Sequence, residues 1–208
     1  MSFFEPPPPP PEPPHAAAAT PEWVGPPDNE VPASALVDLV LTRTDELAVF
    51  VHSGRAYTHG FEFTVGLARR KPPTENGHDP MMLWHPGRRR GFDDALRFGV
   101  AFADGRKVTI FDQQRWWGDP ENQETPDIVL MQRGGGGGGS TWAFRFWVWP
   151  LPPAGPLAFV VEWPAEGIEL TRVEVDSAAV REAAARAVTL WPGSEPPGPG
   201  QVWTRLTK

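Results

Sequence analysis

The stretch from Thr141 to Trp163, TWAFRFWVWPLPPAGPLAFVVEW, restricts the possible fold more than any other part of the chain. Apolar side chains occupy every second position on both sides of a proline-rich turn: Trp142, Phe144, Phe146 and Val148 before it, and Leu157, Phe159, Val161 and Trp163 after it. Because side chains alternate between the two faces of a strand, this spacing predicts two β-strands in the middle of a β-sandwich.

Other segments repeat the two-residue period and extend the predicted sandwich. They cover residues 36–42, 47–51, 61–68, 96–102, 107–112, 127–133 and 168–175. Asp104-Gly105 predicts a tight hairpin turn, and Asp176-Ser177 predicts the start of a helix that runs from Ala178 to Val188. We therefore expect a mainly β fold, an antiparallel β-sandwich of about eight or nine strands with one C-terminal α-helix. This helix is predicted to cover the second face of the central strand and to bury Trp147. The glycines from Gly134 to Gly139 are predicted to form a loop.

Charge and proline divide the chain into three parts. Residues 1–32 form a proline-rich acidic leader that we expect to be disordered, residues 33–191 the sandwich with its helix, and residues 192–208 a Pro/Gly-rich tail. The leader carries five acidic residues and no Lys or Arg, so it accounts for −5 of the net charge of −7. The body is therefore nearly neutral. This balance argues against a nucleic-acid partner. The sequence has no secretory signal at its start and no long uninterrupted apolar run, which favours a cytoplasmic protein without a membrane partner.

Two segments are candidate binding surfaces. The long connection between Arg69 and Asp94 carries two basic clusters, Arg69, Arg70 and Lys71 at its start and Arg88, Arg89 and Arg90 near its end. If its ends converge, the clusters form a patch of six positive charges suited to a phosphate, a nucleic-acid backbone or an acidic protein segment, and the acidic leader is one such segment. A loop that simply stays solvated is an equal alternative. The adjacent Trp116 and Trp117 cannot both face a core, so one of them is predicted to form an exposed aromatic contact.

Catalytic, metal and cofactor motifs give no convergent set. His78, Asp79 and His85 match no ordinary metal-ligand spacing. Ser53 lies beside His52 but outside any Gly-x-Ser-x-Gly elbow, and a serine in a hairpin turn is the better interpretation. The glycine run lacks the Lys-Ser or Lys-Thr of a phosphate loop. The sequence therefore predicts no catalytic residue, no metal ligand and no cofactor, and it contains no cysteine.

The leader MSFFEPPPPPPEPP, the glycine-interrupted hairpin and the closing segments GPLAFVVEWP and LWP resemble a group of uncharacterised actinobacterial proteins. The resemblance covers most of the chain. It implies a source and no activity, because that group carries no assigned function.

The leading hypothesis is a non-enzymatic protein that binds another macromolecule, a protein partner or an acidic segment, through the basic loop and exposed aromatics. The alternative is a carbohydrate- or small-ligand-binding jelly-roll-like domain that uses Trp116, Trp117 and the glycine segment. A third and weaker alternative is a metal-assisted hydrolase at His78, Asp79 and His85. A homodimer is also predicted if the face carrying Trp147 and Trp149 is uncovered.

Overall fold

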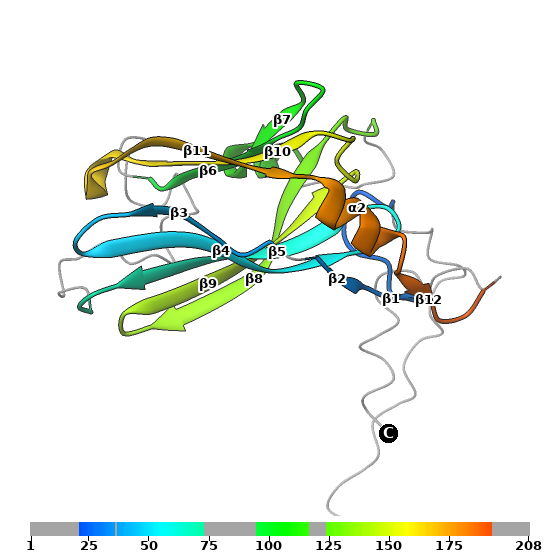
Figure 1. Ribbon diagram of the computed structural model, residues 1–208, viewed down its shortest axis with the longest axis horizontal. Helices are drawn as coiled ribbons and strands as arrows, with labels where there is room; N and C mark the ends of the chain where they lie inside the picture. The colour runs from blue at the N-terminus through cyan, green and yellow to red at the C-terminus, as the bar shows by residue number, and fades with distance from the viewer. Residues whose placement is uncertain (1–20, 36, 73–94, 117–123, 193–208) are drawn as a thin grey trace, which may run out of the picture.

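Alternating apolar residues build two antiparallel sheets that face one another, as Figure 1 shows for the computed structural model of the chain. The structure describes residues 21–35, 37–72, 95–116 and 124–192. The larger sheet has the order β2 (Ala33–Ala35), β4 (Leu47–Ala56), β5 (Phe61–Arg69), β9 (Thr141–Trp149) and β8 (Val129–Gly138), with β3 (Leu39–Arg43) also paired to β4. The smaller sheet has the order β11 (Ile168–Asp176), β10 (Pro156–Trp163), β6 (Arg97–Ala101) and β7 (Lys107–Thr109).

The predicted antiparallel β-sandwich with one helix is confirmed, although the described residues form twelve strands rather than eight or nine. The difference comes mainly from short strands such as β2 and the pair β1 (Glu30–Val31) and β12 (Val188–Thr189), which form a separate two-stranded sheet. Strands of two or three residues are too short for a periodic pattern to mark them in the sequence. Within the described ranges, two 3₁₀ helices, η2 (Ile110–Trp116) and η4 (Pro164–Glu166), lie in the connections between strands.

The two halves of the aromatic stretch lie in the middle of opposite sheets. β9 lies between β5 and β8, whereas β10 lies between β11 and β6. Between the sheets the Phe63 ring contacts Phe98, Phe146 and Phe159, with centroid distances of 5.9, 5.9 and 5.1 Å. Burying a phenylalanine side chain stabilises a fold by roughly 1.5–3 kcal/mol, so this cluster joins the layers. The inner positions predicted from the sequence are therefore the core positions.

The helix α2 (Ala178–Ala184) closes one end of the sandwich (Figure 1). It packs against β2 and β4, and its buried residues Val180, Ala183 and Ala184 join the main core. The prediction that it covers the second face of the central strand was wrong. The predicted end at Val188 was also wrong, because Val188 pairs with Val31 in the small β1–β12 sheet.

The part of the proposed leader that the structure describes is packed against the body. Trp23 is only 3% exposed, and the Asn29 side chain donates to the Trp191 carbonyl at 3.0 Å and accepts from the Trp191 N–H at 2.9 Å. The boundary predicted at residue 32 therefore lies too late in the chain, because burial of Trp23 and pairing of β1 offset the cost of ordering residues 21–31. Residues 1–20 and 193–208 lie outside the described residues.

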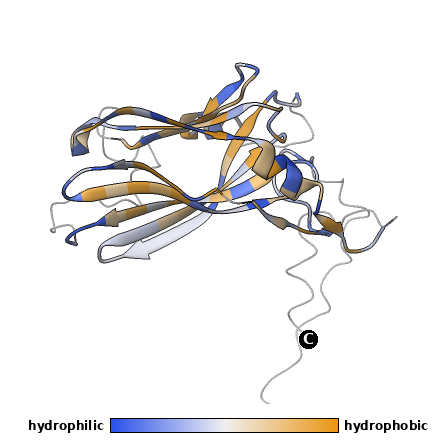
Figure 2. Ribbon diagram, in the orientation of Figure 1, coloured by the Kyte–Doolittle hydropathy of each residue, from blue (hydrophilic) through white to orange (hydrophobic). Residues whose placement is uncertain are grey.

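The glycine run forms strand rather than the predicted loop. Gly134 to Gly138 belong to β8, and only Gly139 and Ser140 make the turn into β9. Gly139 has φ 63°, the backbone that a type II′ hairpin turn reserves for glycine at this position. In Figure 2 this strand is the pale arrow at the lower left.

Two of the strand glycines are required by their neighbours. A Cβ on Gly135 would lie 2.6 Å from Cδ1 of Phe144, and one on Gly137 would lie 2.3 Å from the Thr141 carbonyl oxygen. The ring of Trp142 also occupies the space beside Gly137, at 2.6 Å from the same Cβ position. The aromatic residues of β9 therefore cover the inner side of β8 in place of its own side chains.

Candidate functional site

The predicted basic patch begins with Arg69, which is engaged within the fold. Its guanidinium makes a bidentate ion pair with Glu166, at 2.6 and 3.1 Å, and lies 5.6 Å from the centroid of the Trp163 ring. Both charged side chains are largely buried, at 13% and 16% exposed. Because Arg69 ends β5 and Glu166 ends η4, this pair ties the two sheets together. Its partner Glu166 has no signal in the sequence, since the two residues are far apart along the chain.

The other predicted binding residues are placed only in part. Arg70 and Lys71 follow β5 and are exposed. Arg88, Arg89, Arg90 and Trp117 lie outside the described residues, and so does the side chain of Trp116, whose backbone ends η2. The convergence of the two basic clusters therefore stays a prediction.

Metal ligation at His78, Asp79 and His85 also falls outside the described residues. Within the described part of the chain, no group of three or more histidine and acidic side chains could hold a metal ion.

Ser53 and His52 lie in a bulge of β4 rather than in the predicted hairpin turn. Ser53 has φ 58°, and its Oγ lies 2.8 Å from Nδ1 of His52. The nearby Asp38 accepts a hydrogen bond from the Ser53 backbone N–H at 3.2 Å. A hydrolytic triad requires the carboxylate to orient the histidine, and here Asp38 is bound to the serine backbone instead. The bulge therefore explains the backbone conformation and supplies no triad geometry.

Trp147 forms a second buried cluster on the outer face of the larger sheet, outside the core between the sheets. Its ring is fully buried and meets Tyr57 edge-on, with centroids 5.6 Å apart. Gly60 lies against it, since a Cβ there would be 2.6 Å from the indole ring. Among the described residues, the Trp147 indole Nε1 has no hydrogen-bond partner. The homodimer was predicted only if the face that carries Trp147 and Trp149 is uncovered. At Trp147 this face is covered, so the condition is not met there.

The segment that starts at residue 21 spans this end of the sheet. Glu22 lies 3.4 Å from Nε2 of His59, which precedes β5, and the Val24 carbonyl accepts a hydrogen bond from Arg133 of β8 at 3.2 Å. β5 and β9 lie between these two anchor points in the sheet order. The buried Trp23 therefore sits in a strap across the ends of the central strands.

A charged network adjoins the same cluster. The Glu62 carboxylate is 6% exposed and accepts from Arg55 at 3.1 Å and from the Tyr57 hydroxyl at 3.3 Å, with Nε of Arg145 at 3.7 Å. Burial, together with the negative charge of Glu62, raises the pKa of Tyr57 to about 12. These donors offset the free-energy cost of burying the Glu62 carboxylate. We interpret the network as structural support for the sheet.

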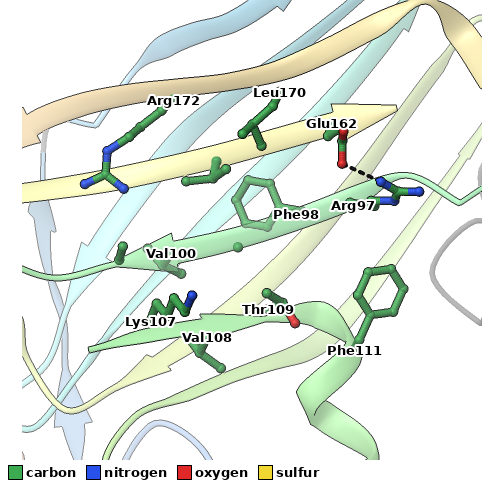
Figure 3. A pocket seen from close by; sticks show the side chains of 13 residues that line it. Arg97, Phe98, Val100, Lys107, Val108, Thr109, Phe111, Glu162, Leu170 and Arg172 are labelled. Carbon is green, nitrogen blue, oxygen red and sulfur yellow. Dashed lines mark hydrogen bonds and ion pairs between the residues drawn. The ribbon is translucent and has the colours of Figure 1, made fainter. Parts of the chain in front are cut away.

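A trough of about 370 Å³ lies on the outer face of the smaller sheet, where Figure 3 shows its side chains. Its floor consists of small outward-facing residues, including Gly99, Ala101 and Val160 of the central strands β6 and β10. β11 contributes one wall and β7 with η2 the other. The volume falls in the range of small-molecule sites, roughly 300–1,000 Å³. The trough therefore has the size and the apolar floor of a ligand site.

The walls of the trough combine apolar and cationic side chains. Leu170, which is 68% exposed, and Phe111 provide apolar surface. Lys107 and Arg172 stand on opposite walls, whereas Arg97 is paired with Glu162 at 2.6 Å where Figure 3 draws the dashed line. Arg172 also lies 2.8 Å from Glu174, but both side chains are about half exposed, so water weakens this pair. The lining thus carries three cations and one carboxylate.

The sequence prediction missed the trough residues. The available signal was a run of small residues at outward positions of two strands, Gly99 and Ala101 in one and Ala158 and Val160 in the other. Small outward residues are also common in strands with no binding role, and their alignment depends on the register of β6 and β10. The predicted Trp116 does end the element η2 that begins beside the trough, at Ile110.

Comparison with known proteins yields no relative: no family model, curated protein or solved structure matches the chain. The resemblance to actinobacterial proteins stays a prediction for this reason. Within the described residues, no helix has the length and apolar character needed to cross a membrane.

Proposed function

We propose that the protein is a non-enzymatic binding protein, and that the trough on the smaller sheet takes a small, mainly apolar ligand that carries an anionic group. This is the small-ligand alternative that the sequence offered, moved from Trp116, Trp117 and the glycine segment to the outer face of β6 and β10. The observation that carries the proposal is a floor of small residues between apolar walls, with Lys107 and Arg172 on opposite sides.

The apolar part of the ligand is supported by the lining. Gly99, Ala101 and Val160 leave a depression without a bulky side chain, and Leu170 presents apolar surface to water beside it. Removing apolar area from water yields about 25 cal/mol per Å², which makes such a depression favourable for an apolar body. Single exposed apolar residues are common on protein surfaces, but Leu170 lies at the border of the trough, where a ligand could cover it.

The anionic group is supported by the charge of the walls. Lys107 is exposed, and Arg172 shares its charge with an exposed glutamate. An anion between them gains two favourable interactions, each worth about 0.2–1 kcal/mol at an exposed site. Such contacts orient a ligand and discriminate against cations more than they provide affinity.

The test uses two fluorescent probes, anilinonaphthalene sulfonate, which is apolar and anionic, and phenylnaphthylamine, which is apolar and neutral. The protein is expected to bind both saturably. The double variant K107E/R172E should weaken the anionic probe by about tenfold, which is roughly 1.4 kcal/mol, and the neutral probe by less than twofold. Filling the floor with Val160→Trp should weaken both.

The matched control is Arg43→Glu, which reverses one exposed cation of β3 in the other sheet. It should leave both titrations unchanged, and each variant must keep the thermal unfolding midpoint of the parent. Probe binding that is absent, or that is equal in the parent, K107E/R172E and V160W proteins, refutes the proposal.

A further inference from the structure

β8 forms one edge of the larger sheet, and half of that edge is uncovered by the described residues. The sheet order places β8 last, beyond β9. η2 protects the first half of the strand, where Gln113 accepts a hydrogen bond from the Gln132 N–H at 3.3 Å. From Gly135 to Gly138 the strand is exposed, and no described strand pairs with its outer side.

The register of the β8–β9 hairpin fixes which backbone groups point outward at this edge. Gly138 and Thr141 are opposite one another next to a two-residue turn, and a pair in that position exchanges hydrogen bonds. Hydrogen-bonded and non-hydrogen-bonded pairs then alternate along the ladder. Gly135 and Gly137 fall on the non-bonded positions, so their N–H and C=O groups point away from β9. The edge thus offers two donors and two acceptors.

The edge also lacks the devices by which proteins usually protect such groups. Long exposed edges are normally blocked by charged residues, proline or short length. The edge strand β11 of the smaller sheet follows this rule, with Glu169, Arg172 and Glu174 exposed along it. The corresponding half of β8 carries no side chain at all. A Cβ on Gly136 or Gly138 would meet no atom within 4 Å, so packing does not require glycine at either position.

Side chains of β9 nevertheless give this edge two distinct sides. On the inner side the rings of Phe144 and Trp142 lie beside Gly135 and Gly137. On the outer side the Arg145 guanidinium lies 3.6 Å from the Cβ position of Gly134, and this side chain is half exposed. Phe144 and Trp142 are only 1% and 7% exposed, so the inner side chains of an added strand would extend this buried layer at its edge rather than contact open rings. On the outer side the added strand would meet the half-exposed Arg145, whose charge is partly offset by Glu62 at 3.7 Å.

We propose that β8 binds an extended peptide segment of a partner protein by strand addition. The segment has apolar residues at alternate positions, directed to the inner side near Phe144 and Trp142, and acidic residues at the intervening positions, on the side of Arg145. Main-chain hydrogen bonds to Gly135 and Gly137 supply affinity, and the alternating side chains supply specificity. This interaction is independent of the proposed trough ligand, because the two surfaces lie on different sheets.

A second copy of this chain fits the edge less well than such a peptide. Two β8 strands in antiparallel pairing would place glycine opposite glycine, which buries almost no apolar side chain. Stable dimer interfaces bury about 1,200–2,000 Å² in total, far more than a backbone-only ladder of four or five residues. The partner strand must therefore bring the side chains that β8 lacks.

The probe is a fluorescein-labelled peptide of alternating valine and glutamate with four residues of each. We expect saturable binding, followed by fluorescence anisotropy, with a dissociation constant between about 1 and 100 µM. In this arrangement the valine backbone groups face β8, whereas the glutamate backbone groups face away. N-methylation of the valine amides should abolish binding at 1 mM protein, and N-methylation of the glutamate amides should weaken it by less than threefold.

Two substitutions at Gly136, where the space is open, form the matched pair on the protein side. Gly136→Glu should weaken binding of the glutamate-containing peptide by threefold or more, and Gly136→Lys should strengthen it. Absence of peptide binding, equal effects of the two N-methylated peptides, or equal affinities of the two Gly136 variants each overturn the proposal. A peptide-independent dimer that both Gly136 variants dissociate would also overturn it, in favour of self-pairing.

Discussion

Replacing Trp23 by alanine tests whether residues 21–31 belong to the cooperative fold. The side chain is 3% exposed, although it lies in a segment whose composition predicts disorder. Removing a buried tryptophan costs about 3–5 kcal/mol, through lost burial and the cavity that remains. Domain stabilities are only about 5–15 kcal/mol, so the loss would be a large share of the total.

The assay is equilibrium unfolding in urea, with thermal unfolding as a second measurement. For a chain of this size each kcal/mol lowers the melting temperature by about 2–4 °C, so the Trp23→Ala variant should melt about 6–20 °C below the parent. Trp191→Ala is the matched control, since its side chain is 58% exposed, and it should change stability by less than about 0.5 kcal/mol.

A Trp23→Ala variant that loses less than about 1 kcal/mol would refute this reasoning. It would show that the strap detaches before the sandwich unfolds. Equal losses in the Trp23 and Trp191 variants would be a further contradiction, because their exposures differ so widely.

Three other predictions follow from the larger sheet. Gly137→Ala should destabilise the protein by about 2 kcal/mol or more in urea unfolding, because the new Cβ would clash with the backbone. Gly136→Ala should be neutral or slightly stabilising, because the space there is open. Equal effects of the two substitutions would contradict the strand register. Glu62→Ala should cost about 1–3 kcal/mol by the same measurement, because it leaves the buried Tyr57 hydroxyl without its acceptor, whereas Arg55 is 45% exposed and stays hydrated; an unchanged urea midpoint would show that Glu62 does not support the sheet. The raised pKa of Tyr57 favours the neutral hydroxyl in the folded state, so its contribution is complete below pH 10 and is lost as pH rises towards 12; a Tyr57→Phe variant should lack this alkaline decline in the urea midpoint.

The trough and the edge of β8 depend on different kinds of information. The glycine run was visible in the sequence, and only its interpretation as a loop was wrong. Glycine by itself has a low preference for strands. This preference is overridden by Trp142 and Phe144 of β9, whose rings cover the inner side of the glycine strand. The trough had no comparable signal, because it requires the outward residues of β6 and β10 to align across the sheet.

The sequence determined the sandwich, because the alternation of apolar residues that become buried is visible within each short segment. The positions of Phe63, Phe146 and Phe159 in the core follow directly from that two-residue period. Only the tertiary structure decided which charges are satisfied and which surfaces remain open. Arg69 meets Glu166, and Arg133 binds the Val24 carbonyl next to the buried Trp23, through contacts between residues about a hundred positions apart, which no local pattern encodes.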